Sequence, residues 1–240
     1  RRRVEETAEK LRIGHLLERK TAKLSGGEMQ RVSLGRAIVR EPRIFLMDEP
    51  LSNLDAKLRE SLRIELQHLQ KTQGSTTLFV THDQIEALTM ADRLAVLHRG
   101  RVVQIGTPED IYDRPATIFV AELVGTPRIS LLRAARQNGH LAVNGAPVQL
   151  PAAGGSALPA ELVVGVRPED VLPAPAGAFE GHLALVEPLG SETILHIQAG
   201  DQTLLSTVPG LAPYHLGDAI RFDIPGERLH YFGTDGVRVK

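Results

Sequence analysis

The chain has 240 residues, of which 42% are hydrophobic and 24% charged, and this composition is typical of a globular protein with one large domain or two modest ones. Its formal net charge is −1, so bulk electrostatics favours neither a nucleic-acid partner nor an anionic membrane surface. The absence of cysteine excludes disulfides and thiolate-bound metals. No apolar run in the sequence approaches the length needed to cross a bilayer, so a role in transport would need separate membrane subunits.

The first half of the chain alternates predicted helices and strands. Residues 4–20 carry apolar side chains at helical spacing, with an interruption near Gly14, and a second helix is expected from about Gly26 to Val39. Residues 44–48 form an apolar run that ends in an acid, which is typical of a strand in a sheet covered on both faces. A second strand of this kind is expected at 76–81.

Capping and turn signals place the remaining elements of this half. Asp55 is expected to cap a helix that carries leucines at every third or fourth position, and Thr107 is expected to start another helix. Between them the sequence predicts a short helix at 84–91 and a hairpin at 93–105. The strand–helix–strand order implies an α/β layered domain, which we place at residues 1–124.

The pattern changes after Gly125, and residues 125–240 are expected to form a separate all-β domain. Helical periodicity fades there, and short alternating segments are separated by Gly, Pro and Asp. Such spacing predicts a small antiparallel β domain of barrel type. Two loops within it, Pro151–Ala160 and Pro173–Ala178, are rich in Ala, Gly and Pro.

Two short stretches of the first half carry chemistry. Ser25-Gly26-Gly27 opens a helix, where backbone N–H groups can approach an anion closely. Asp48 and Glu49 end the apolar run, and they are candidates for holding Mg²⁺ through a water and for positioning an attacking water. Together the two stretches indicate nucleotide hydrolysis. The simpler alternatives are a serine cap followed by a turn, and two solvated acids at the end of a strand.

Four motifs in this order resemble the ATPase subunits of ABC transporters. In chain order they are the signature motif at Ser25-Gly26-Gly27, the Walker B strand at Ile44–Glu49, the D-loop at Leu51–Asp55 and the switch-histidine loop at Thr81–Asp83. The resemblance implies the C-terminal part of an α/β P-loop ATPase domain that uses ATP and Mg²⁺. Glu28 departs from the commoner glutamine, and an acid there would repel the γ-phosphate unless it points away or meets a cation.

The resemblance also implies a role for each residue of these motifs. Glu49 and His82 would be catalytic, and Asp48 would hold Mg²⁺. The nucleotide-binding residues, which would face ATP held by a second ATPase subunit across a dimer, would be Ser25, Gly26, Gly27, Glu28 and Asp55. Asp55 is also a predicted helix cap, and the two roles are compatible.

Two stretches of the second half, Val164–Glu169 and Glu187–Thr193, resemble the OB-like (TOBE-type) accessory domain of sugar-importer ATPases of the maltose and glycerol-3-phosphate type. This resemblance implies an importer subunit that is peripheral on the cytoplasmic face of the membrane and energises uptake of a sugar or related solute. Its implied partners are the second ATPase subunit, membrane permease subunits and, indirectly, an extracytoplasmic solute-binding protein. No nucleic-acid partner is implied.

One motif of the family, the phosphate-cradling Gly-x-x-x-x-Gly-Lys-Ser/Thr, occurs nowhere in the sequence. We therefore expect an N-terminally truncated ATPase that is inactive alone, with the apolar faces of the strands at 44–48 and 76–81 left exposed. The alternative is a non-catalytic interaction or regulatory chain that donates its signature face to a partner ATPase. A soluble ABC ATPase of repair or translation fits less well, because the second half is β-rich.

Overall fold

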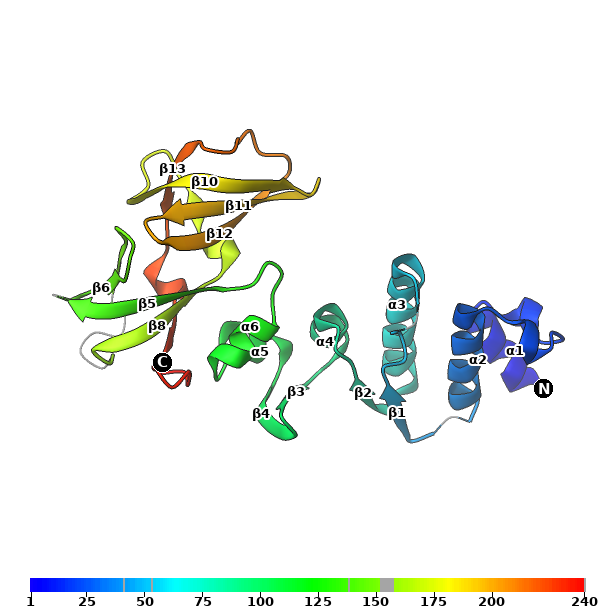
Figure 1. Ribbon diagram of the computed structural model, residues 1–240. Coiled ribbons are helices and arrows are strands. Elements are labelled where there is room, and N and C mark those ends of the chain that lie inside the picture. Colours follow the sequence, from blue (N-terminus) through cyan, green and yellow to red (C-terminus); the bar gives the residue numbers. More distant parts are fainter. Residues whose placement is uncertain (41, 53, 138, 152–157, 240) are drawn as a thin grey trace. The chain divides into compact units, whose positions relative to one another are not determined.

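The computed structural model describes residues 1–40, 42–52, 54–137, 139–151 and 158–239 (Figure 1). It divides into two compact units, Arg1–Asp92 and Arg93–Lys240. The first unit is α/β, and the second is mainly β. Among the helices of the described ranges, none is long and apolar enough to cross a membrane.

The first unit packs helices against a two-stranded sheet. Its elements are α1 (Arg2–Lys10), α2 (Gly26–Ile38), β1 (Ile44–Asp48), α3 (Ala56–Gln73), β2 (Thr76–Val80) and α4 (Gln84–Met90). The two strands are parallel, with Ile44 opposite Thr76. Leu34 of α2, Phe45 of β1 and Leu62 of α3 belong to one buried apolar cluster. The other predicted helices and strands of this part are confirmed, with small differences at their ends. The helix expected over residues 4–20 is confirmed only as far as Lys10, and short 3-10 turns follow it at Gly14–Leu16 and Thr21–Lys23.

One face of this sheet is open to solvent. On β1, Ile44 is 60% exposed and Leu46 is 76% exposed, and on β2 Leu78 is 61% exposed and Val80 is 49% exposed. The alternate side chains, such as Phe45, pack into the buried cluster. The expectation of a sheet covered on both faces is therefore wrong for the described residues, and the expectation of exposed apolar strand faces is confirmed.

Helix α2 begins with a capping box. The hydroxyl of Ser25 accepts a hydrogen bond from the Glu28 amide (3.3 Å), and the Ser25 amide donates to Glu28 Oε2 (2.7 Å). The hydrogen bond from the Ser25 backbone lowers the pKa of Glu28, with smaller contributions from the Ser25 side chain and from Arg19. The ionised carboxylate also suits the positive end of the helix dipole.

The second unit starts with a hairpin and two short helices. These are β3 (Leu94–His98), β4 (Arg101–Gly106), α5 (Pro108–Asp113) and α6 (Ile118–Leu123). Thr107 and Asp110 form a capping box at the start of α5, with Pro108 in the first turn. The hairpin and the helix start predicted from the sequence are thereby confirmed.

Two five-stranded antiparallel sheets follow and enclose one apolar core. One sheet has the order β12-β11-β10-β13-β9, and the other has the order β14-β8-β5-β6-β7. The strands are β5 (Ser130–Gln137), β6 (His140–Val143), β7 (Gln149–Pro151), β8 (Glu161–Val166), β9 (Leu172–Pro173), β10 (Phe179–Pro188), β11 (Glu192–Ala199), β12 (Gln202–Pro209), β13 (Ala219–Asp223) and β14 (His230–Phe232). They confirm the predicted β domain. Within the predicted loop Pro151–Ala160, residues 152–157 lie outside the described ranges.

A buried arginine joins the two short helices to the β strands. Arg167 follows β8 and is 1% exposed, and its guanidinium donates hydrogen bonds to the backbone carbonyls of Tyr112, Ala121 and Val124. It also lies 4.1 Å from the centroid of the Tyr112 ring. Carbonyls at helix C-termini carry partial negative charge and offset this buried cation. These contacts group α5 and α6 with the second compact unit, while the domain boundary expected at 124/125 stays a prediction.

We expect Leu46→Gln to reduce self-association of the chain, because the substitution removes the most exposed apolar side chain of the open sheet face. The free energy of unfolding should change by about 0.5 kcal/mol or less, as for other exposed positions. The matched control is Leu62→Ala. The Leu62 side chain is fully buried, so this substitution should lower the free energy of unfolding by about 2–5 kcal/mol. Sedimentation velocity and urea unfolding measure the two effects. Unchanged self-association of the Leu46 variant would contradict this account of the open face.

We expect the Glu28 cap to make stability depend on pH. Because the folded pKa of Glu28 lies below its ordinary value of 4.5, the contribution is complete above that value and is lost as pH falls through the lowered folded pKa. The difference in melting temperature between the wild-type chain and Glu28→Gln should therefore shrink as pH is lowered from 6 to 3, roughly the range over which carboxylates titrate. Glu18→Gln, at an exposed acid, is the control. A difference that stays constant across this range would be inconsistent with the cap.

Candidate functional site

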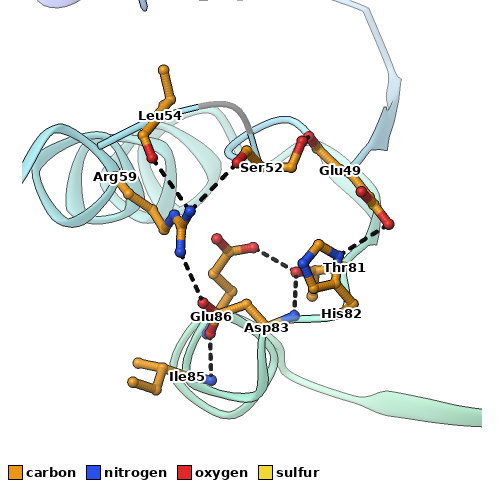
Figure 2. A network of polar contacts seen from close by, with 9 residues as sticks. All are labelled: Glu49, Ser52, Leu54, Arg59, Thr81, His82, Asp83, Ile85 and Glu86. Atoms are coloured by element: carbon orange, nitrogen blue, oxygen red, sulfur yellow. Dashed lines mark hydrogen bonds and ion pairs between the residues drawn. The ribbon is translucent and has the colours of Figure 1, made fainter. Parts of the chain in front are cut away.

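The two predicted catalytic residues meet where β1 and β2 end. Because the strands are parallel, both carboxyl ends lie at the same edge of the sheet, and Asp48 is the partner of Val80. The Glu49 amide then donates a hydrogen bond to the Val80 carbonyl (2.9 Å). His82 Nδ1 lies 3.1 Å from Glu49 Oε1 (Figure 2). Both side chains remain largely exposed, at 73% for His82 and 46% for Glu49, so the pair is open to a ligand.

The backbone at Glu49 is in the left-handed region, with φ of 43°. Its carbonyl accepts hydrogen bonds from both the amide and the hydroxyl of Ser52, at 3.3 and 3.0 Å. A non-glycine residue in this region is uncommon and costs energy, and such residues concentrate at functional sites. The turn takes the chain sharply out of β1 and leaves the Glu49 side chain facing His82.

Hydrogen bonds on either side of His82 fix the loop that carries it. Thr81 Oγ1 donates to Glu86 Oε2 (2.6 Å) and accepts from the Asp83 amide (3.0 Å). Asp83 Oδ1 caps α4 by accepting from the amides of Ile85 (2.8 Å) and Glu86 (3.2 Å). Glu86 is 4% exposed and was not singled out from the sequence. Its signal is the spacing Asp83-x-x-Glu86, an acid three residues after a helix cap.

The signature residues lie at the start of α2. The carboxylate of Glu28 folds back onto the Ser25 amide, and its Oε1 atom lies 3.5 Å from Arg19 Nη1. The Glu28 carboxylate therefore points back to its own helix start and also meets a cation, Arg19, which are the two conditions under which an acid here would not repel the γ-phosphate. The amides of Gly26 and Gly27 belong to the first helical turn, which has no acceptor one turn earlier.

The two glycines of the signature differ in their surroundings. A Cβ added to Gly26 would meet no described atom within 4 Å, so this position leaves space for a ligand. A Cβ added to Gly27 would lie 2.7 Å from the Leu58 side chain, so Gly27 also lets α2 pack closely on α3. Gly26 is the better candidate for close approach of a phosphate to the backbone.

Contacts connect α2 to the loop that follows Glu49. The side-chain amide of Gln30 donates a hydrogen bond to the Pro50 carbonyl. Asp55 caps α3 by accepting a hydrogen bond from the Leu58 amide (3.0 Å), which confirms its predicted capping role. Its implied place at a subunit interface stays a prediction, and Asn53 of the predicted D-loop lies outside the described residues.

The residues around Asp48 fit a magnesium ion that is bound together with phosphates. Asp48 is the exposed last residue of β1. The described residues contain no group of three or more His, Cys, Asp or Glu side chains placed to hold a metal ion. Mg²⁺ usually keeps several waters and takes one or two carboxylates plus substrate phosphates rather than an all-protein cage. A single carboxylate at the end of β1 suits that mode of binding.

Comparisons with known proteins agree with this geometry. The ABC transporter family matches residues 1–52, and the TOBE domain matches residues 164–232. The sn-glycerol-3-phosphate import ATP-binding protein UgpC of Ruegeria sp. (strain TM1040) is 47% identical over 242 residues, which cover 99% of this chain and 68% of the relative. The UgpC protein of Jannaschia sp. (strain CCS1) is 43% identical over 236 residues, covering 98% of this chain and 67% of that relative. The chain therefore belongs to the ATP-binding subunits of ABC importers.

Proposed function

We propose that this chain carries the signature, Walker B, D-loop and switch-histidine parts of an ATP-hydrolysing site that energises uptake of a sugar or related solute. The observation that carries the proposal is the contact between Glu49 and His82 at the ends of two parallel strands, with Asp48 beside them. The similar proteins are named for import of sn-glycerol-3-phosphate, which supports a solute of this class.

Each residue of the pair has a separate role in the proposed reaction. Glu49 orients the attacking water and accepts its proton as a general base. His82 has Nδ1 towards Glu49, so an Nδ1–H donates a hydrogen bond to that carboxylate. The other ring nitrogen can then donate a hydrogen bond to the γ-phosphate when the imidazole carries a proton on both nitrogens. Asp48 would hold Mg²⁺, and the ion would offset charge on the phosphates.

The site is proposed to be composite. The sequence has no Gly-x-x-x-x-Gly-Lys-Ser/Thr, so a polypeptide segment with that motif has to supply the phosphate cradle. Ser25, Gly26 and Gly27 then face ATP held by a second ATPase subunit, with Glu28 ordering the first turn of the helix and Asp55 at the same interface. The open space in front of Gly26 supports this arrangement.

We further propose that the subunit acts at the cytoplasmic face of the membrane, bound to permease subunits. An extracytoplasmic solute-binding protein would act through those permeases and would not touch this chain. We propose no nucleic-acid partner, because a formal net charge of −1 gives no electrostatic attraction to nucleic acid.

We expect Glu49→Gln to lower ATP turnover by about 10²–10⁴-fold, because the amide cannot accept the proton of the attacking water. ATP binding and dimerisation should persist, since the substitution keeps the size of the side chain. Turnover and nucleotide binding are measured with Mg²⁺ on the full product of the reading frame that contains this sequence. The 240-residue chain alone is the blank and should give no turnover.

Glu60→Gln, at an exposed acid of α3, is the matched control and should leave turnover unchanged. If the wild-type full product binds no ATP with Mg²⁺, the ATPase proposal fails and the interaction-module alternative takes its place. If Glu49→Gln turns over ATP at the wild-type rate, the role of Glu49 as base is wrong.

A further inference from the structure

We propose that Arg59 is a positioning residue that ties Ser52 and Leu54, in the loop after Glu49, to the loop 81–83. In this way it keeps Glu49 and His82 correctly placed during the proposed reaction. The proposal rests on the proposed ATPase function and adds a residue to it. Arg59 is the fourth residue of α3, and its side chain reaches towards both loops (Figure 2).

The guanidinium of Arg59 contacts three acceptors from the two loops. Its Nη2 atom donates to the carbonyls of Ser52 (3.4 Å) and Leu54 (3.3 Å), and its Nη1 atom lies 3.5 Å from Asp83 Oδ2. Each of these contacts is long, so no single contact fixes the positions of the two loops. The three contacts together fix them, because the planar guanidinium presents its donors in fixed directions to acceptors from both segments.

These contacts close a ring that includes the catalytic pair. Glu49 contacts His82, the neighbour of His82 is Asp83, and Asp83 contacts Arg59. Arg59 in turn binds the Ser52 carbonyl, and the Ser52 hydroxyl donates back to the Glu49 carbonyl. Among the described residues, Arg59 has no hydrogen bond or ion pair with Glu49 or His82, so its effect on the pair is indirect. Figure 2 shows the ring from close by.

The position of Arg59 is not explained by stability alone. Its Nε atom is buried and has no hydrogen-bond partner among the described residues, which is a cost. A second link between the same helices already exists, since Gln67 Nε2 of α3 donates to the Thr89 carbonyl of α4 (2.7 Å). Arg59 differs from Gln67 in joining α3 to the loop that carries His82. Arg59, a half-buried cation whose Nε is not satisfied by the described residues, is therefore placed for geometry at the site.

Two variants of Arg59 and two controls test this inference. Arg59→Met removes the guanidinium, and Arg59→Lys keeps the charge without the fork. Arg63→Met removes a cation one turn further along α3, where the side chain makes no hydrogen bond or ion pair to the described residues of either loop. Gln67→Leu removes the other hydrogen bond between α3 and α4.

The first readout is amide hydrogen exchange in the 240-residue chain, which does not depend on ATPase activity. We expect Arg59→Met to speed exchange in both residues 49–55 and residues 81–86, whereas Arg63→Met and Gln67→Leu leave residues 49–55 unchanged. Unchanged exchange in either loop of Arg59→Met would overturn the proposed tie. Arg59→Lys should be intermediate, and it keeps the test valid if the methionine variant does not fold.

The second readout is steady-state ATP hydrolysis by the full product of the reading frame. We expect Arg59→Met to lower kcat by about 10-fold or more with little change in KM, because small displacements of catalytic groups slow chemistry without removing contacts to the nucleotide. Arg59→Lys should recover part of kcat. An equal loss of kcat in Gln67→Leu would mean that Arg59 is merely structural. If the wild-type protein hydrolyses no ATP, the proposed function fails, and the exchange data alone decide whether Arg59 ties the loops.

Discussion

The parallel pairing of β1 with β2 is the constraint on which the candidate site depends. It places Asp48 opposite Val80 and brings the Glu49 amide to the Val80 carbonyl. Both chain segments therefore leave the sheet side by side, one into the turn at Glu49 and the other into the loop of His82. Backbone hydrogen bonds set this arrangement. The side chains of Glu49 and His82 therefore approach each other because β1 and β2 are paired, and their contact is not what holds the strands together. The exposed contact between Glu49 and His82 would contribute little stability by itself.

The rest of the first unit supports the end of β1 through the loop that follows it. Helix α2 contacts that loop through Gln30, and Gly27 allows α2 to approach Leu58 at the start of α3. Helix α3 contacts it through Arg59. The candidate catalytic acid Glu49 and the candidate interface residue Asp55 thus lie on one short segment of the chain. The helix that begins with the signature motif contacts this segment through Gln30, so a displacement of the segment would reach the helix as well.

Local signals in the sequence predict much of this structure. Helix starts at Ser25, Asp55 and Thr107 follow from the capping residue at each position, and the structure confirms them. The same local rule would have placed the Glu28 carboxylate on the Ser25 amide, where the structure has it, and not beside a phosphate. The antiparallel β domain followed from short alternating segments separated by turn residues, and it is also confirmed.

Contacts between distant residues were not predictable in this way. Arg59 meets Asp83 and Arg167 meets Tyr112 across long stretches of sequence, and no local pattern marks either arginine. The open face of the sheet is a further case, because a continuous apolar run does not say which of its faces another element will cover. The candidate pair Glu49 and His82 is an intermediate case. Each residue was predicted from its own motif, while their contact depends on the register of two strands.

The most direct test of the account is the distance between positions 49 and 82. The chain has no cysteine, so a double variant with Glu49→Cys and His82→Cys can carry two spin labels without background. If backbone pairing of β1 and β2 sets the site, the double-labelled chain should show strong dipolar broadening even though both native side chains are gone. A spectrum equal to the sum of the two single-labelled spectra would mean that the strand ends are not held side by side, and the central claim would be wrong.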